Sequence, residues 1–514
     1  MSKVVLTDKI GAFFLKMLKQ KATYRFFFTV VVSLLAFISA PLSAKPLNAD
    51  PAWQTQKLEN GFSWQLLQAT HRPSDPIEIR FVLNTGSLTE TLTEKGFLFS
   101  LFKAALLQEN GLPLIQLNQF NASTQDNPQP VITIGHDATI ITLRVPNNQP
   151  EALKSAIGLL GGLVKENSLS TELLNKSLDE NAALLIAAKP QNSQDGFWLN
   201  RIKNSSLVGF DPVLAQPAVI ELDKLDEYYQ KWFTPDAMHL YIVGKVDARI
   251  LADTINKSFG ELTGTRLKPA PAAILQPLES GTMIFSQAGL EQAVLTLYWD
   301  ASWNSVSASK DLEKSWLLEL AREAIFTRIN QKLSSKSNDK QKLSFECSVL
   351  FQRQLCGLNL SNSTSNLAPQ FTKISAELHS LKETGIKEDE FKAFIELKNQ
   401  ELANLFATYA HTDLSKLIDN RIHSQQNGIV DISLEQYQQL RQNFLSTLTL
   451  DEINDAIEAF LSRPATLVIR QPSGEIEIDV EPMYQKYIEL IHPSKISEQI
   501  TTGESSVENK VDIQ

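Results

Sequence analysis

The chain has 514 residues, of which 43% are hydrophobic and 21% charged, and its formal net charge is −10. This composition is typical of a globular protein and excludes a fibrous or disordered one. The length exceeds one ordinary hydrophobic core, so two or more domains are expected. Phosphate binding needs clustered Lys and Arg, and the sequence contains no long basic run, which argues against a nucleic-acid partner.

The N-terminal segment, residues 1–44, has the three parts of a secretory signal peptide. Basic residues come first, a mostly apolar stretch without charge follows over 26–38, and small residues lead to Ala44. A helix over the apolar stretch would span about 20 Å, short of the roughly 30 Å hydrocarbon core of a membrane. We therefore predict export to the periplasm with cleavage after Ala44 or Ala40. An uncleaved inner-membrane anchor, with the chain facing the periplasm, is the alternative.

Residues 50–265 are predicted to form an N-terminal domain of strands and helices. Strands are expected as a pair around the Asn60-Gly61 turn within 53–67, at 77–83, as a pair around His136-Asp137 within 131–145, and at 238–243. Helices are expected at 94–109, closed by Asn110-Gly111, and at 151–166, 170–188, 225–233 and 251–259.

Residues 266–278 hold several prolines with little periodicity, which is typical of an interdomain linker. The second half, residues 279–472, repeats the order of the first. Its expected elements are a strand at 293–299, a helix at 312–333, a hairpin within 343–360, helices at 371–381 and 388–407, a helix opening at 450, and a strand at 466–469. Residues 473–514 are expected to be an acidic and polar tail.

The repeated order indicates a duplicated unit. In the first half a helix leads through Pro235 to the strand 240–243, and in the second half a helix leads through Pro464 to the strand 466–469. We therefore predict an α+β fold of two homologous lobes, each a mostly antiparallel sheet with helices packed on one face.

The only two cysteines, Cys347 and Cys356, lie on either side of a predicted turn near Phe351-Gln352. In an exported protein a cross-strand disulfide between them is one interpretation. Two small buried residues in a sheet are the other. A zinc site at this place is not expected, because two thiols without a neighbouring His are too few ligands.

After the predicted strand 77–83 the chain reads Gly86-Ser87-Leu88-Thr89-Glu90, then five residues, then Gly96. This pattern resembles the approach to the zinc helix in the insulinase or pitrilysin family of metallopeptidases, where His-x-x-Glu-His follows. Weaker similarities in the same order extend from Trp53 to Pro472. The resemblance implies that family's two-lobed metallohydrolase-like fold. Without it, residues 97–107 are simply a buried core helix, since apolar residues occupy almost every face.

The resemblance places the zinc motif on three residues that cannot perform its chemistry: Phe99, Phe102 and Lys103. In active members two imidazoles one helical turn apart bind zinc, and the carboxylate between them takes a proton from zinc-bound water. A benzyl group has no lone pair for a metal, and an ammonium opposes a dication. The remaining ligand would fall near Glu180 or Asn181. Zinc, the family's cofactor, is therefore not expected here.

Active members also bring an Arg and a Tyr from the second lobe to the substrate carbonyl, where they stabilise the oxyanion. By register these two positions are Ser334 and Phe345, across an insertion-like stretch at 335–341. Both halves of the catalytic apparatus would then be absent.

The resemblance implies three functional alternatives, because chains of this half-length can pair as an active subunit with a degenerate one. The first is a pseudopeptidase, the non-catalytic subunit of a periplasmic zinc protease that handles unfolded peptides, in a heterodimer with an active homologue. The second is a peptide-binding or scaffold protein of the cell envelope without a protease partner. The third is an active zinc endopeptidase with an unorthodox site.

Overall fold

The computed structural model describes residues 45–122, 130–165, 170–176, 185–188, 196–210, 220–334 and 342–493. The predicted signal segment and the end of the predicted tail lie outside these ranges. The chain divides into a small unit, residues 1–47 with 308–310, and a large unit of 48–307 with 311–514. Within the small unit Pro46 forms an isolated antiparallel bridge with Ala308. In the described part of the chain, no helix combines the length and apolarity that a membrane span requires.

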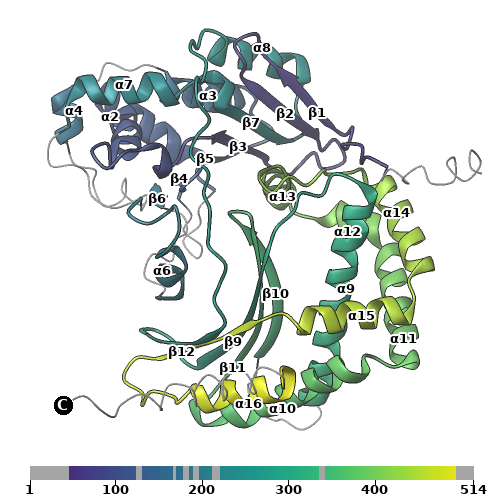
Figure 1. Ribbon diagram of the computed structural model, residues 1–514. Helices are drawn as coiled ribbons and strands as arrows, with labels where there is room; N and C mark the ends of the chain where they lie inside the picture. Colours follow the sequence, from purple (N-terminus) through teal and green to yellow (C-terminus); the bar gives the residue numbers. More distant parts are fainter. Residues whose placement is uncertain are drawn as a thin grey trace, which may run out of the picture. The chain divides into compact units, whose positions relative to one another are not determined.

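The first lobe of the large unit is built on a seven-stranded sheet with the order β1-β2-β7-β3-β5-β4-β6 (Figure 1). The pairs β2–β7 and β4–β6 are parallel and the other pairs are antiparallel. Its strands are β1 Trp53–Lys57, β2 Ser63–Gln68, β3 Ile77–Leu83, β4 Ile132–Ile134, β5 Thr139–Val145, β6 Ile186–Ala188 and β7 Met238–Gly244.

Helices cover one face of this sheet and enclose the first hydrophobic core. The longest helices, α2 and α3, contribute many of the buried aliphatic side chains of this core. These helices are α2 Phe97–Gln119, α3 Pro150–Val164, α4 Thr171–Asn175, α7 Leu222–Trp232 and α8 Ala248–Phe259, and the 3₁₀ turns of the lobe are η1 Ser87–Thr89 and η2 Pro235–Ala237. Helix α6 Gly196–Ile202 instead contacts residues 281–287 of the second lobe. Residues 266–278, the predicted linker, contain no helix or strand.

The second lobe holds a five-stranded sheet with the order β10-β11-β9-β12-β8, in which only β12–β8 is parallel. Its strands are β8 Gly281–Gln287, β9 Ala293–Ser302, β10 Lys342–Leu350, β11 Arg353–Asn362 and β12 Ala465–Pro472. Its helices are α9 Ser309–Ser334, α10 Thr364–Thr384, α11 Glu388–Ala403, α12 Leu405–His411, α13 Leu414–Gln426, α14 Leu434–Thr447, α15 Leu450–Leu461 and α16 Glu481–Ile491. The α+β class and the two lobes are therefore confirmed.

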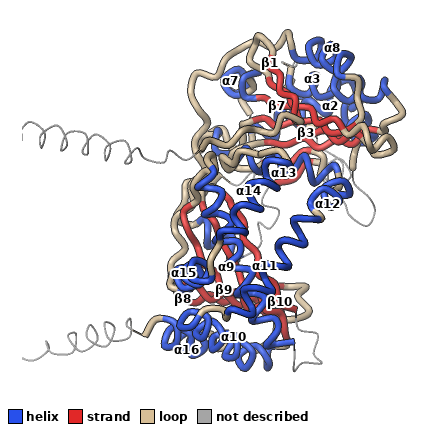
Figure 2. Tube along the Cα trace, turned by 90° about the vertical axis from the view of Figure 1, so that its right-hand side faces the viewer, coloured by secondary structure: helices blue, strands red, loops and turns tan. Residues whose placement is uncertain are grey.

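Helix α13 lies on the face of the first sheet opposite to α2 and α3 (Figures 1 and 2). Its side chains Leu414, Ile418 and Ile422 share a small core with residues of β2, β3 and β7. As a result β3 is buried at every position, although its side chains alternate between the two faces. The expectation of helices on one face only does not hold for this sheet, because a helix from the second half of the sequence covers its other face.

Several predicted boundaries differ from the structure. Helix α2 continues to Gln119, although Glu109 and Gly111 have positive φ where the end was expected. Within the segment 170–188, expected to be one helix, the described residues form the short helix α4 and the strand β6, which pairs with β4. The predicted tail contains α16, whose Tyr487 and Ile491 are fully buried in the second core. The apolar run at the end of the segment 170–188 is as consistent with a buried strand as with a helix. The pairing of β6 with β4 makes it a strand.

Candidate functional site

The Gly-Ser-x-x-Glu segment forms a tight turn against the β4–β5 loop. The backbone N–H groups of Ser87 and Leu88 donate to the carbonyls of Gly135 and His136, both at 3.0 Å. A Cβ at Gly86 would lie 2.4 Å from the carbonyl carbon of His136. Only glycine allows this close approach of two backbones. The glycine at this position is therefore explained by packing between two loops of the first lobe.

Glu90 caps the N-terminus of α2. Its two carboxylate oxygens accept from the backbone N–H groups of Gly96 and Leu98, each at 2.9 Å. Gly96 has a φ of 83°, a left-handed conformation that favours glycine. Burial raises the pKa of Glu90 to about 7, against the opposing effect of these two hydrogen bonds. Within the motif, Glu90 and Gly96 therefore form the N-terminus of α2.

The first two degenerate positions are packing residues of α2. Phe102 is 1% exposed, and its ring lies 5.7 Å from that of Phe233. Phe99 is partly buried against the same core. Neither side chain has an atom that could accept a proton or coordinate a metal ion.

Lys103, the third degenerate position, is a buried cation. It is 3% exposed, and its Nζ donates to the carbonyl oxygen of Leu174, the residue before the last of α4, at 2.5 Å. Burial lowers the pKa of this amine. The three side chains do not fit a zinc ion, and no step of zinc chemistry can be built on them. Glu180 and Asn181 lie outside the described residues. Elsewhere in the described ranges, no group of three or more His, Cys, Asp or Glu could hold a metal ion.

The two positions predicted from the second lobe lie on α9 and β10. Ser334 is the last residue of α9, and its side chain is outside the described part. Phe345 is 6% exposed in the second core, where its ring lies 5.6 Å from Trp299 and 5.8 Å from Phe460. The phenyl ring therefore supports the core and carries no hydroxyl that could reach a substrate. The cysteines are joined: Cys347 and Cys356 face each other across β10 and β11 and form a disulfide.

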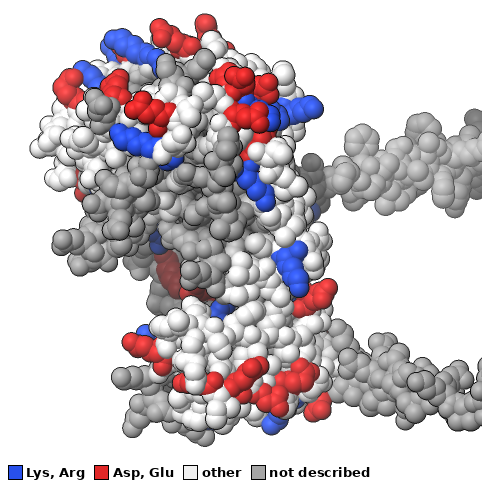
Figure 3. All heavy atoms as spheres, turned by 90° about the vertical axis from the view of Figure 1, so that its left-hand side faces the viewer, with Lys and Arg blue, Asp and Glu red and all other residues white. Residues whose placement is uncertain are grey.

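Two cavities that are each lined by several elements of the fold lie away from these positions. One, of about 740 Å³, is lined by the β4–β5 loop, residues 270–273, the β10–β11 turn and the end of α13. The other, of about 470 Å³, lies within the second lobe beside the disulfide. Among their described lining residues, neither cavity includes Phe99, Phe102, Lys103 or Phe345. Sequence patterns did not point to these cavities, because residues from separate parts of the chain line them. Basic and acidic side chains are interspersed on the described surface in Figure 3.

A two-lobed α+β fold, each lobe with its own sheet and helices, defines the class of protein, an insulinase-type metallohydrolase-like fold. The family model described as "Peptidase M16 inactive domain" matches residues 220–397. "Protein YhjJ" of Salmonella typhi is 38% identical over 465 residues, which cover 90% of this chain and 94% of that protein. The chain therefore belongs to the insulinase (M16) peptidase family.

Solved structures agree with this assignment. The structure described as "Predicted insulinase family protease from Yersinia pestis" has 40% sequence identity and a TM-score of 0.81, and the match covers 88% of this chain and 99% of the other. The first half of the periplasmic protease PqqL from Escherichia coli has 14% identity and a TM-score of 0.71, with 91% and 100% covered. At that identity the second likeness concerns the fold alone.

Proposed function

We propose that this chain is a catalytically degenerate insulinase-family homologue that acts as the non-catalytic subunit of a periplasmic zinc protease and helps it to handle unfolded peptides. The burial of Lys103 at the metal position carries the proposal. At the position that the resemblance assigns to a metal ligand, an ammonium that donates to a backbone carbonyl inside the lobe would repel a dication.

The cellular location follows from two independent supports. The segment 1–44 has the pattern of a secretory signal peptide. PqqL, whose first half shares this fold, is described as a periplasmic protease. An uncleaved inner-membrane anchor that leaves both lobes in the periplasm remains the alternative.

The size of the chain supports the proposed partner. The fold of this chain corresponds to one half of the PqqL protease. A chain with this fold and without a metal position can contribute one wall of a peptide-binding chamber, and an active homologue would contribute the other wall and the zinc ion. This pairing assigns the catalytic chemistry wholly to the partner.

The first experiment measures metal and activity on the purified mature chain. We expect far less than one zinc per chain and no peptide cleavage that a chelator stops. The control is an active insulinase-family peptidase treated in the same way. Near-stoichiometric zinc with chelator-sensitive cleavage would instead establish the unorthodox-site alternative.

The second experiment asks for the partner. The tagged chain is purified from its own periplasm, and we expect a zinc-carrying homologue of comparable size to accompany it in a defined ratio. A monodisperse monomer that captures peptides but no peptidase would contradict the subunit role and select the envelope scaffold.

A further inference from the structure

The cavity of about 470 Å³ in the second lobe has the composition of a ligand site. It lies between the N-terminal half of α9, the loop after β9, the β10–β11 hairpin and the end of α15. Its volume is within the range of about 300–1,000 Å³ that is usual for small-ligand pockets. Apolar walls come from Trp303, Leu318, Phe460 and the Cys347–Cys356 disulfide, and two guanidinium groups join them, those of Arg322 and Arg463.

Aromatic rings of the second core hold both guanidinium groups. The Arg322 guanidinium lies 6.0 Å from the ring of Phe345, and Arg463 lies 5.4 Å from the ring of Phe460. These two rings are themselves 5.8 Å apart. Arg322 also donates to the carbonyl oxygen of Phe345 at 2.6 Å. The two cations are therefore placed by the core of the lobe rather than by a mobile surface.

Arg463 has no counter-ion on its own lobe. It is partly buried, and its guanidinium forms no ion pair or hydrogen bond with a residue in the described part of the chain, although its backbone N–H donates to the carbonyl of Phe460 at 3.2 Å. Burial alone lowers the pKa of its guanidinium, without any effect from a nearby acid. A desolvated cation without a partner is costly, so an anion that enters the cavity would be stabilised there.

Glu319, an acidic residue of the cavity, does not compensate this charge. Glu319 lines the cavity, but its carboxylate pairs with Arg441 at 3.1 Å, and Arg441 does not line the cavity. Asp311 lies on the first turn of α9. Lys314 of the same helix is exposed, carries the opposite charge and also lines the cavity. Arg322 forms only a long ion pair with Glu323, at 3.9 Å, and the Arg463 guanidinium forms none in the described part of the chain, so both can bind an external anion. Their planar donor groups match a carboxylate in a two-pronged geometry.

We propose that this cavity binds the free C-terminal carboxylate of a peptide whose last side chain is apolar. The carboxylate would accept from Arg463 and Arg322, and the apolar side chain would lie against Trp303, Leu318 and Phe460. The proposal rests on the proposed peptide-handling function and names the feature of the peptide that this chain recognises.

The test uses calorimetric titration of the full mature chain with the tripeptide N-acetyl-Ala-Ala-Leu and with the same peptide amidated at its C-terminus. We expect the free acid to bind and the amide to bind about tenfold or more weakly, because one charge-assisted contact is lost. Equal affinity for the two peptides, or no binding of the free acid, would overturn the proposal.

Variants locate the site. Arg463→Gln should weaken binding of the free acid about tenfold or more, and Arg463→Lys, which keeps the charge without the planar fork, should weaken it less. The matched control is Arg249→Gln on α8, an exposed arginine outside the cavity, which should bind as the wild type does. Thermal unfolding of each variant checks that it is folded. Unchanged binding in a folded Arg463→Gln protein would contradict the assignment. N-acetyl-leucine that binds as tightly as the tripeptide would show a small-acid site instead.

The outcomes separate this proposal from the proposed function. If a zinc-carrying partner is found but the free acid and the amide bind equally well, the subunit role is retained and only the peptide-end site is rejected. Binding that depends on the free carboxylate and on Arg463, without any peptidase partner, retains the site and removes the subunit role.

Discussion

At the scale of single residues, the positions predicted from the zinc motif have structural roles. Phe102 fills the first core against Phe233, and the amine of Lys103 satisfies a carbonyl at the end of α4. A substitution at either position therefore acts on stability rather than on chemistry. The sequence could identify which side chains stand there, but not that Lys103 is buried, because a lysine on a helix is usually exposed.

We predict that the cost of the buried Lys103 cation is visible in the pH dependence of stability. Its folded pKa lies below its ordinary value of 10.5, so between the two values the unfolded chain binds more protons. The free energy of unfolding of the wild type should rise, relative to Lys103→Met, as the pH increases toward 10.5. At neutral pH the two proteins should differ by no more than about 1–2 kcal/mol.

Urea unfolding of both proteins from about pH 7.5 to about pH 10 measures this difference. The matched control is Lys154→Met, because Lys154 is 43% exposed in a surface ion pair with Glu151. The free energy of unfolding of Lys154→Met should change with pH in the same way as that of the wild type. Parallel curves for Lys103→Met as well would show that the amine is not desolvated in solution.

At the scale of elements, the start of α2 depends on one ionisable cap. Glu90 accepts from two of the N–H groups that a helix leaves without partners at its N-terminus. Its pKa of about 7 lies above the ordinary value of 4.5, so the folded chain keeps the proton over this window while the unfolded chain has lost it. This contribution to stability is present at low pH and is lost as the pH rises from 4.5 to about 7.

We therefore predict that Glu90→Gln removes a part of the pH dependence of stability. The wild type should lose on the order of 3 kcal/mol relative to the variant between these two pH values, and the difference should be constant above them. Urea midpoints at several pH values measure it, with the exposed Glu151→Gln as the control. If the wild type instead became more stable relative to Glu90→Gln as the pH rises through this interval, the raised pKa would be contradicted.

The β10–β11 hairpin depends on its disulfide as a second element. Cys347 and Cys356 are directly paired residues nine positions apart around the Phe351-Gln352 turn, whose two residues both have positive φ. We predict that replacing both cysteines by alanine lowers the free energy of unfolding by about 2–3 kcal/mol, because the unfolded chain loses the closure of a short loop. The wild type under reductant should match the double variant, and the double variant should not respond to reductant. Equal stability with and without the disulfide would refute this.

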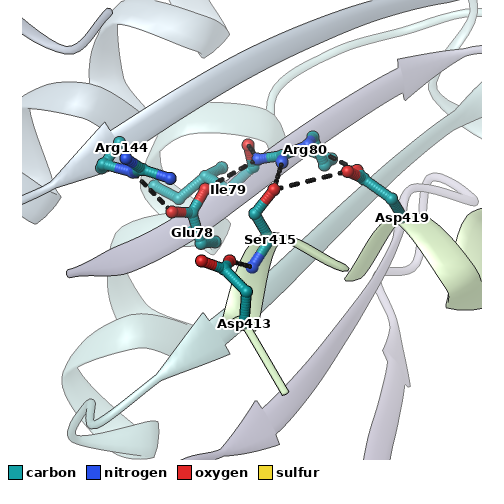
Figure 4. Close-up of polar contacts among 7 residues, drawn as sticks. All are labelled: Glu78, Ile79, Arg80, Arg144, Asp413, Ser415 and Asp419. Atoms are coloured by element: carbon teal, nitrogen blue, oxygen red, sulfur yellow. Dashed lines mark hydrogen bonds and ion pairs between the residues drawn. The ribbon is translucent and has the colours of Figure 1, made fainter. Parts of the chain in front are cut away.

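At the scale of the whole large unit, a polar network joins α13 to the first sheet (Figure 4). Arg80 on β3 is 4% exposed and donates to Asp419 at 2.9 Å and to Ser415 at 3.1 Å, both on α13. Glu78, which is 1% exposed, pairs with Arg80 at 3.1 Å and with Arg144 at 2.6 Å. On the same helix Arg421 donates to Gln65 of β2 at 2.9 Å. The helix from the second half is thus attached to the first sheet by both apolar and charged contacts.

We predict that Arg80→Met lowers the free energy of unfolding by about 3 kcal/mol, because it removes one of the two cations paired with the buried Glu78 and the donors to Asp419 and Ser415. Limited proteolysis should also cut earlier near α13. The matched control is Arg144→Met, which removes the other partner of Glu78 but does not contact α13; Arg144 is 38% exposed, so the loss should be smaller. Equal losses and equal protease patterns in the two variants would contradict a role for Arg80 in attaching α13.

Local sequence patterns determined much of this protein. Alternation specified β3 and β5, the Asn60-Gly61 turn specified the first hairpin, and the Phe351-Gln352 turn specified the second hairpin with one cysteine on each strand. The side chains at the predicted metal positions could also be read directly, because residue type alone decides whether they could bind a metal ion. These features are local, and backbone geometry or side-chain chemistry fixes them over a few residues.

Only the tertiary structure decided the remainder. Strand β6 in an apolar run, the burial of α16 and the docking of α13 on β3 all depend on partners distant in the sequence. The same holds for the cavity that brings Arg322 and Arg463 together from α9 and the end of α15. The physical reason is that burial and the compensation of charge are properties of the neighbours a residue acquires on folding, which no local pattern contains.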